Sequence, residues 1–566
     1  MIVKSWEKEI YQVQLDNEKF VLARLKKAYK ESIQEAKEKV AYLATKKQTQ
    51  SVIYQKQYQE SLVKQLETVY NKMCKNMYQD IDSYLKDCYE DGFLSTMYGL
   101  HKQGIPLIFP IQQEEAARMA GRTGDGVKLS DKLYQNAGKT ARAARDVITR
   151  GLSSGTSYAD IARNLERTSE TTLNQAYRIA RTEGHRVQNE VNFNTLRKAK
   201  DSGADVVKQW DSTLDGRTRP HHAQLDGQIR EIDEPFEVAG RSVQYPGGFG
   251  VAAEDINCRC AVLQRAKWAL DEDELQTLKD RAAFYGLDKS KDFADFKKKY
   301  KIADKKAKKL ALIKIDNLKQ YFGETHSLKI QEILQKAPKS VQNIWNKYVT
   351  KLGVTSTTSK GTAYYSPMDQ GITINLNDVT KDKSFVFVAS RGIEPYRKAY
   401  GTIFHEFGHN ISDLIAKDLG YTWSDAAVTY KSKKYAGHTL NSMLKEEAKD
   451  YVNQVWKDLK DEAKKQGLKA SSVRKYEAYA KITKEIRNLP VIAGGDISDM
   501  WEGATKASVR GFMGHGKTYW NYHEPGVEAF AEMFDATVNN PDSLAAIKTY
   551  FPKTYEIFLE ILEGMS

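Results

Sequence analysis

Two histidines with a glutamate between them form the segment with the clearest chemical potential. In His405-Glu406-Phe407-Gly408-His409 the imidazoles are four residues apart, so on a helix both face one side and can bind one metal ion. Glu406 stands beside the first histidine and could act as a general base. The pattern is typical of zinc hydrolases, in which Zn²⁺ lowers the pKa of bound water towards about 7 and so prepares it for attack on a peptide carbonyl.

A second short motif offers the remaining ligand. Glu528-Ala529-Phe530-Ala531-Glu532 has two carboxylates four residues apart, again on one face of a helix. Glu528 can complete a His/His/Glu ligand set, while Glu532 can hydrogen-bond a ligating imidazole. The alternatives are helix-surface histidines with the glutamates in an ordinary amphipathic turn, or a site that binds metal without activity. Agreement between two motifs far apart in the sequence favours the zinc site.

Periodicity predicts the elements that must position these residues. A helix over residues 341–352 should be followed by a hairpin of two strands, Thr362–Ser366 and Gly371–Leu376. Either strand could hold an extended substrate as an added β-strand. The helix that carries the two histidines should come next, and its buried side is predicted to consist of Ile403, Phe404, Phe407, Ile411 and Leu414.

The amino-terminal part of the chain is predicted to be a long amphipathic helix. No Gly or Pro precedes Gly92, and apolar residues recur at spacings of three and four. Such a stripe is a packing surface rather than a cofactor site. The apolar stripe includes Leu22, Leu25, Tyr29, Ile33, Ala36 and Val40.

Between Trp210 and Cys260 the sequence changes to turns and short strands, which predicts a small α+β module. Cys258 and Cys260, with His221 or His222 and with Asp215, could form a structural zinc site, because thiolates and imidazole suit zinc. The single residue between the cysteines is fewer than zinc knuckles usually have, so ordinary turn and core roles are favoured. With Cys74 and Cys88 the chain has only four cysteines, too few for a disulfide framework.

The composition, 41% hydrophobic and 28% charged over 566 residues, is that of a soluble globular protein with several domains. The net charge of +13 is densest at residues 296–309, which hold eight lysines and one aspartate. A solvated helical linker is the favoured interpretation, with contact to DNA as the alternative. No apolar run is long enough to span a bilayer, and the amino terminus lacks the pattern of a signal peptide. We therefore expect synthesis in the cytoplasm without membrane integration.

Residues 140–262 contain an ordered set of charged, aromatic, Gly and Cys residues. They are Arg181-Thr182-Glu183, Arg186, Asn189, Trp210, Asp215 to Arg219, His222, Leu225-Asp226-Gly227, Pro246-Gly247 and Asn257 to Cys260. This set resembles the phage head morphogenesis, or minor head protein, family. The resemblance implies a structural protein of a tailed-phage virion, in the head interior or near the portal, with portal and capsid proteins as partners. The helical region 1–139 would help to join the protein to these subunits.

Residues 337–566 resemble the gluzincins, in particular the anthrax lethal factor-type metallopeptidase domain, through the two motifs and their order. The resemblance implies His405, His409 and Glu528 as zinc ligands, Glu406 as the catalytic base, and Glu532 behind the ligands. It also implies a tyrosine shortly before the third ligand, for which Tyr522 is the first candidate and Tyr519 the alternative. Loops are expected at Gly494-Gly495-Asp496 and around His515 and His523, and either histidine could bind substrate.

Together these observations predict a multidomain, mainly α protein with α+β modules. The expected order is a helical region 1–139, a head-morphogenesis module 140–262, a charged helical connector 263–336 and a gluzincin-like domain 337–566. The expected function is that of a virion head protein carrying a zinc metalloendopeptidase with Zn²⁺ as cofactor and an unknown protein substrate. The alternatives are a purely structural head protein with an inactive, metal-binding zincin domain, or a bacterial zincin toxin.

Overall fold

The computed structural model describes residues 5–45, 52–154, 156–267, 272–383, 386–388, 392–511 and 514–566. The chain divides into two compact units, Met1–Asp304 and Lys305–Ser566. The division falls inside helix α9 (Phe293–Leu310), so the predicted connector 263–336 contributes to both units. The prediction of a multidomain, mainly helical chain is confirmed. Among the described helices, none combines the length and the apolar character needed to cross a bilayer.

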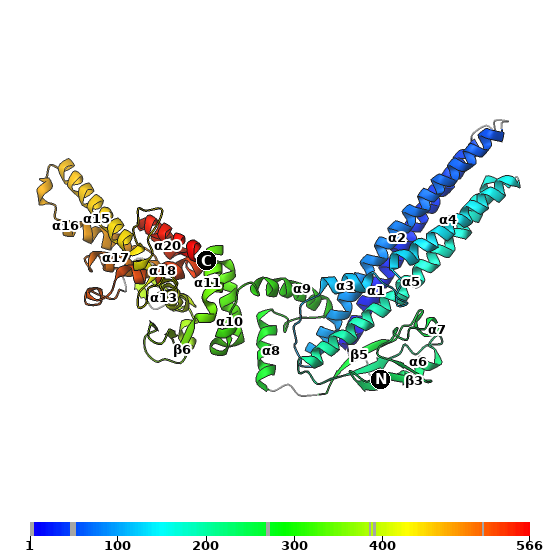
Figure 1. Ribbon diagram of the computed structural model, residues 1–566, viewed down its shortest axis with the longest axis horizontal. Coiled ribbons are helices and arrows are strands. Elements are labelled where there is room, and N and C mark those ends of the chain that lie inside the picture. Colours follow the sequence, from blue (N-terminus) through cyan, green and yellow to red (C-terminus); the bar gives the residue numbers. More distant parts are fainter. Residues whose placement is uncertain are drawn as a thin grey trace. The chain divides into compact units, whose positions relative to one another are not determined.

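The first unit is built on long helices that lie side by side (Figure 1). The predicted amphipathic helix is present as α1, and five residues of its stripe, Leu25, Tyr29, Ile33, Ala36 and Val40, are buried in the core of this unit. Its packing partners are chiefly α2 and α5. The helices of this bundle are α1 (Ser5–Thr45), α2 (Val52–Lys102), α3 (Gln113–Ala120), α4 (Leu129–Ser153) and α5 (Tyr158–Asp201).

A small α+β module, Val206–Ala266, follows the bundle as predicted. Its antiparallel sheet has the strand order β2-β1-β5, and β3 and β4 form a separate hairpin. The core beneath is small, with Trp210 and Phe236 as its largest members. The elements are β1 (Val206–Asp211), α6 (Pro220–Leu225), β2 (Ile229–Glu231), β3 (Phe236–Val238), β4 (Arg241–Val243), α7 (Ala252–Asp255) and β5 (Ala261–Ala266).

The lysine-rich run 296–309 lies in α9, which follows α8 (Glu272–Phe284). Several of its lysines pair with carboxylates, so part of their charge is already compensated. Lys297 pairs with Asp91, and the Nζ atom of Lys301 lies 2.5 Å from Oε1 of Glu90. Contact between this run and DNA stays a prediction.

The second unit places helices around a three-stranded sheet of order β6-β8-β7, in which β8 is central. The predicted hairpin is confirmed, because β7 pairs antiparallel with β8 from Tyr364 opposite Thr373 to Ser366 opposite Gly371. The predicted helix over 341–352 corresponds to α11 and the 3-10 turn η2. The elements before the histidine helix are η1 (Asp316–Leu318), α10 (Lys319–Lys336), α11 (Lys339–Tyr348), η2 (Val349–Lys351), β6 (Gly353–Ser356), β7 (Tyr364–Ser366), β8 (Gly371–Thr373), α12 (Leu376–Val379), β9 (Val386–Val388) and β10 (Gly392–Glu394).

The histidine and glutamate motifs lie on α13 and α18, which pack against each other in this unit. The predicted apolar side of α13 is buried, with every one of its five residues at most 5% exposed. The remaining elements are α13 (Gly401–Asp418), α14 (Ala426–Thr429), α15 (Leu440–Lys465), η3 (Ala470–Ser472), α16 (Lys475–Arg487), α17 (Val491–Thr505), η4 (Tyr519–Asn521), α18 (Pro525–Asn539), α19 (Pro541–Tyr550) and α20 (Pro552–Met565).

Gly408 permits the close approach of α13 and α18. A Cβ atom at this position would lie 2.9 Å from the Cα atom of Ala531 and 3.2 Å from Cβ of Phe534. The first of these is a backbone atom, so it cannot turn away as a side chain could. Gly408 is therefore required by helix packing, although glycine lowers the intrinsic stability of a helix.

We expect Gly408→Ala to destabilise the second unit by about 1–3 kcal/mol, because the added methyl group must push α18 away from α13. Gly495→Ala is the matched control, since a Cβ atom there would meet nothing within 4 Å. That change should stabilise α17 by up to about 1 kcal/mol. Denaturant unfolding of the full chain measures both, and equal effects of the two substitutions would contradict the packing role of Gly408.

Candidate metal centre

The crossing of α13 and α18 brings together the three residues predicted as zinc ligands. Oε2 of Glu528 lies 3.6 Å from Nε2 of His405 and 3.4 Å from Nε2 of His409. One donor atom from each residue lies within 4.8 Å of the other two. In a tetrahedral zinc site, nitrogen and oxygen ligands are roughly 3.3 Å apart, so a zinc ion would fit with small adjustments.

Both histidines can be reached from solvent while the carboxylate is held inside. The side chains of His405 and His409 are 20% and 13% exposed, and that of Glu528 is 7% exposed. The second nitrogen of His405, Nδ1, lies 3.4 Å from Oε1 of Glu532. This contact orients the ring with Nε2 towards Glu528, as carboxylates behind zinc-binding histidines do.

The electrostatics of the cluster favour positive charge between the glutamates. Burial alone would lower the pKa of His405. The carboxylates of Glu532 and Glu528 outweigh this effect and hold the pKa well above its ordinary value. Burial also opposes ionisation of Glu528, yet the imidazoles of His409 and His405 hold its pKa well below the usual range. A divalent cation would satisfy the same preference and displace the imidazole protons.

Three aspartates extend this cluster and were not predicted from the sequence. Burial raises the pKa of Asp496 to about 6, of Asp499 to about 8 and of Asp535 to about 7, and the charge of His405 opposes each shift. A positive charge at His405 therefore stabilises all three carboxylates. The predicted loop at Gly494-Gly495-Asp496 is wrong, because these residues lie in α17, where tertiary packing outweighs the low helix propensity of glycine. The three-residue spacing of Asp496 and Asp499 was the available signal.

Tyr519, rather than Tyr522, lies at the cluster. Its hydroxyl donates a hydrogen bond to Oε1 of Glu528, whereas Tyr522 is 84% exposed. The Tyr519 ring is stacked between two imidazoles, with centroid distances of 4.0 Å to His515 and 3.9 Å to His523. The geometry thus favours the alternative tyrosine and gives His515 and His523 a place beside it.

Glu406 is buried on α13, between the two histidines in sequence. Burial is the main cause of the raised pKa of Tyr519, and the carboxylates of Glu528 and Glu406 add to it. Glu406 also contributes to the raised pKa of His405. The charge of Glu406 therefore influences the titration of both side chains.

In the small α+β module the structure brings together His222, Cys258 and Cys260, the second predicted donor set. The other two candidates lie apart from it. Nδ1 of His221 contacts Oε1 of Glu254 at 3.1 Å. Asp215 pairs with Arg259 through two contacts of 2.6 Å.

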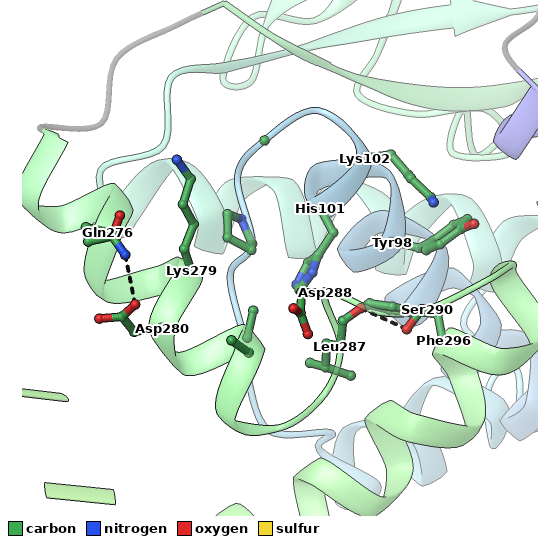
Figure 2. Close-up of a pocket in the computed structure, with 14 residues that line it drawn as sticks. Tyr98, His101, Lys102, Gln276, Lys279, Asp280, Leu287, Asp288, Ser290 and Phe296 are labelled. Carbon is green, nitrogen blue, oxygen red and sulfur yellow. Dashed lines mark hydrogen bonds between the residues drawn. The ribbon is translucent and has the colours of Figure 1, made fainter. Parts of the chain in front are cut away.

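A cavity of about 450 Å³ lies in the first unit, between the end of α2, α8 and the start of α9 (Figure 2). Some of its polar groups pair with one another or with the backbone. Nε2 of His101 lies 2.9 Å from the carbonyl oxygen of Leu107, and Gln276 donates to Asp280 at 2.8 Å. Burial lowers the pKa of His101 to about 4, so the ring is neutral near pH 7. Neither predicted donor set lines this cavity.

Comparison with known proteins finds relatives of part of the first unit. Residues 143–263 match the family described as Phage Mu protein F like protein. Over 117 residues the chain is 37% identical to minor head protein GP7 of Bacillus phage SPP1, which covers 20% of this chain and 38% of that protein. Over 266 residues it is 29% identical to NAD(+)–arginine ADP-ribosyltransferase EFV of Enterococcus faecalis, covering 46% of this chain and 55% of that protein.

The chain thus spans about half the length, or less, of the curated relatives it matches. No solved structure matches it significantly. The matches to the Phage Mu protein F like family and to the minor head protein support the predicted resemblance of residues 140–262 to phage head morphogenesis proteins. The matched family residues lie entirely in the first unit.

We expect Glu532→Gln to weaken zinc binding about 10- to 100-fold, because the amide orients His405 poorly. Glu528→Ala should weaken it further, since it removes a ligand and the charge that balances both imidazoles. Competition with a zinc chelator measures the affinity, in a Cys258→Ser/Cys260→Ser background that removes the other donor set. Glu524→Ala is the control, because Glu524 directly precedes the same helix, makes no side-chain capping bond to it, and pairs with Lys445 at 2.6 Å. Unchanged affinity in Glu528→Ala would remove Glu528 from the site.

Proposed function

We propose that this protein is a phage minor head protein whose second unit is a zinc-dependent peptidase. The matches of the first unit to the Phage Mu protein F like family and to the SPP1 minor head protein support the head-protein part. They support a location in the virion and association with other head proteins, for which the portal and capsid subunits are the proposed partners. The convergence of His405, His409 and Glu528 is the observation that carries the peptidase part.

A zinc ion bound at these residues would polarise the scissile carbonyl and lower the pKa of the attacking water. Glu406 would accept a proton from the attacking water and deliver it to the leaving amine. Its burial beside the first histidine ligand in sequence, and its influence on the pKa values of His405 and Tyr519, support this role. A tightly held base of this kind contributes by orientation as well as by proton transfer.

Tyr519 is the group that we assign to the developing oxyanion. Its hydroxyl donates to Glu528, and a small rotation would redirect it to a substrate oxygen beside the ligands. The stacked rings of His515 and His523 hold the Tyr519 ring on both faces, which limits its other movements.

The substrate backbone is proposed to add to the sheet at β7. Strand β8 already pairs with β6 on one side and β7 on the other, so of the two predicted strands only β7 has an unpaired edge among the described residues. Tyr365 on β7 donates to Asp413 on α13 at 2.8 Å, which fixes this strand against the helix of the histidines. An extended peptide on β7 would satisfy its free backbone groups.

The ADP-ribosyltransferase activity is the one named for the Enterococcus relative, and the alignment covers 55% of that protein. The grouped His and Glu side chains of the second unit could instead hold a metal ion. The rival that remains is a structural head protein whose second unit binds metal without turnover.

Glu406→Gln should retain zinc and lose peptide-bond cleavage by about 10²- to 10⁴-fold, because only the proton acceptor is removed. Zinc content is measured by elemental analysis, and cleavage by a search for new protein termini in phage head proteins and in a host lysate. Wild-type protein that binds zinc and produces no new termini in either sample would favour the structural rival.

Tyr519→Phe should lower kcat by roughly 10²-fold, since one donor to the oxyanion is lost, with little change in KM. Tyr522→Phe provides the control, because that side chain is exposed and should leave kcat unchanged. The opposite result, with loss of activity in Tyr522→Phe alone, would reverse the assignment.

A further inference from the structure

The second donor set has the geometry of a thiolate zinc site. Nδ1 of His222 lies 3.2 Å from Sγ of Cys260 and 3.6 Å from Sγ of Cys258. Ligand atoms of a tetrahedral zinc ion bound by sulfur and nitrogen are roughly 3.5–3.8 Å apart. We propose that the small α+β module binds a structural zinc ion through His222, Cys258 and Cys260. This site is independent of the peptidase proposed for the second unit.

The local backbone explains why one residue between the cysteines is sufficient. Cys258 and Cys260 directly precede β5, and residues two apart on an extended chain project to the same side. Their exposures follow this alternation. Both cysteines are 3% exposed, whereas the intervening Arg259 pairs at the surface with Asp215. The single residue between the cysteines, which made a metal site the less favoured interpretation of the sequence, is thus compatible with a metal site in the folded module.

A buried carboxylate orients the histidine. Oε2 of Glu254 lies 3.2 Å from Nε2 of His222, and Glu254 is itself 5% exposed. Arg241 and His221 hold Oε1 of the same carboxylate at 2.6 and 3.1 Å. Nε2 of His222 and Oε2 of Glu254 are close without a hydrogen bond between them. The carboxylate favours a proton on Nε2, which leaves the lone pair of Nδ1 directed at the two sulfurs, as metal-binding histidines require.

The surroundings favour a structural ion over a nucleophilic cysteine. His222 is 2% exposed and stacks on Phe249 at a centroid distance of 5.7 Å, so a substrate could not reach the thiols. Thiolate and imidazole donors select zinc over harder cations. Ser212, whose Oγ lies 3.4 Å from Sγ of Cys260, or a water molecule can supply the fourth ligand.

The module also has a physical need for a cross-link. Its core has seven buried members, which is a small apolar core for segments with long turns. Two of these members are the cysteines themselves. A zinc ion would join α6 to the segment before β5 and so fix the two halves of the module to each other.

The experiment uses the full chain in a His405→Ala/His409→Ala background, which removes the other proposed zinc site. Elemental analysis should find about one zinc ion per chain, and Cys258→Ser/Cys260→Ser should abolish it. Cys74→Ser/Cys88→Ser is the matched control and should retain zinc, because those cysteines lie on α2. Zinc that persists after loss of Cys258 and Cys260 would overturn the proposal.

A second measurement does not depend on the folding of a cysteine variant. Cobalt(II) loaded into the same background should give the near-ultraviolet charge-transfer absorption that only thiolate ligands produce, and zinc should displace it. Absence of this absorption in folded, cobalt-loaded protein would overturn the proposal. Glu254→Gln should lower zinc affinity about 10- to 100-fold while the cobalt absorption is retained.

Discussion

The packing of α13 against α18 is the contact on which the second unit depends. It buries the apolar side of the histidine helix and, in the same step, places the carboxylate of Glu528 opposite His405 and His409. A buried carboxylate is costly unless a positive group compensates it, so the apolar contacts stabilise an arrangement that is otherwise unfavourable. The buried aspartates of α17 and α18 add to that cost. The free energy gained by helix packing thus stabilises a cluster of buried carboxylates, and this cluster strongly favours a cation beside it.

The two units use the same arrangement at their donor sets, although their folds differ. In each, one histidine nitrogen faces the other donors while its second nitrogen contacts a buried glutamate, Glu532 behind His405 and Glu254 behind His222. The ligand chemistry then separates the two. Two partly exposed imidazoles with a buried carboxylate suit a site that exchanges ligands with solvent, whereas two buried thiols suit a closed structural site.

Much of the fold and of the candidate site could be predicted where a sequence pattern depends only on neighbouring residues. The apolar period of α1, the β7–β8 hairpin and the two spaced motifs each depend on a few neighbouring residues, and the structure contains all of them. The failures have a common physical cause, because they depend on contacts between distant segments. Gly494 and Gly495 favour a loop locally, yet packing makes them helical. Similarly, sequence spacing could not separate Tyr519 from Tyr522, and the pairing of Cys258 and Cys260 with His222 requires the folded module.

The backbone contact at Gly408 restricts how this unit can diverge. Because the opposing atom is the Cα of Ala531, no smaller side chain at position 531 relieves it. A relative that replaces the glycine must therefore shift α18 along or away from α13, which would also displace Glu528 from the imidazoles. Position 408, the second of the two residues between Glu406 and His409, therefore determines how closely α13 and α18 can approach each other. A larger residue at position 408 would therefore change the distances between Glu528 and the two imidazoles as well as the helix packing.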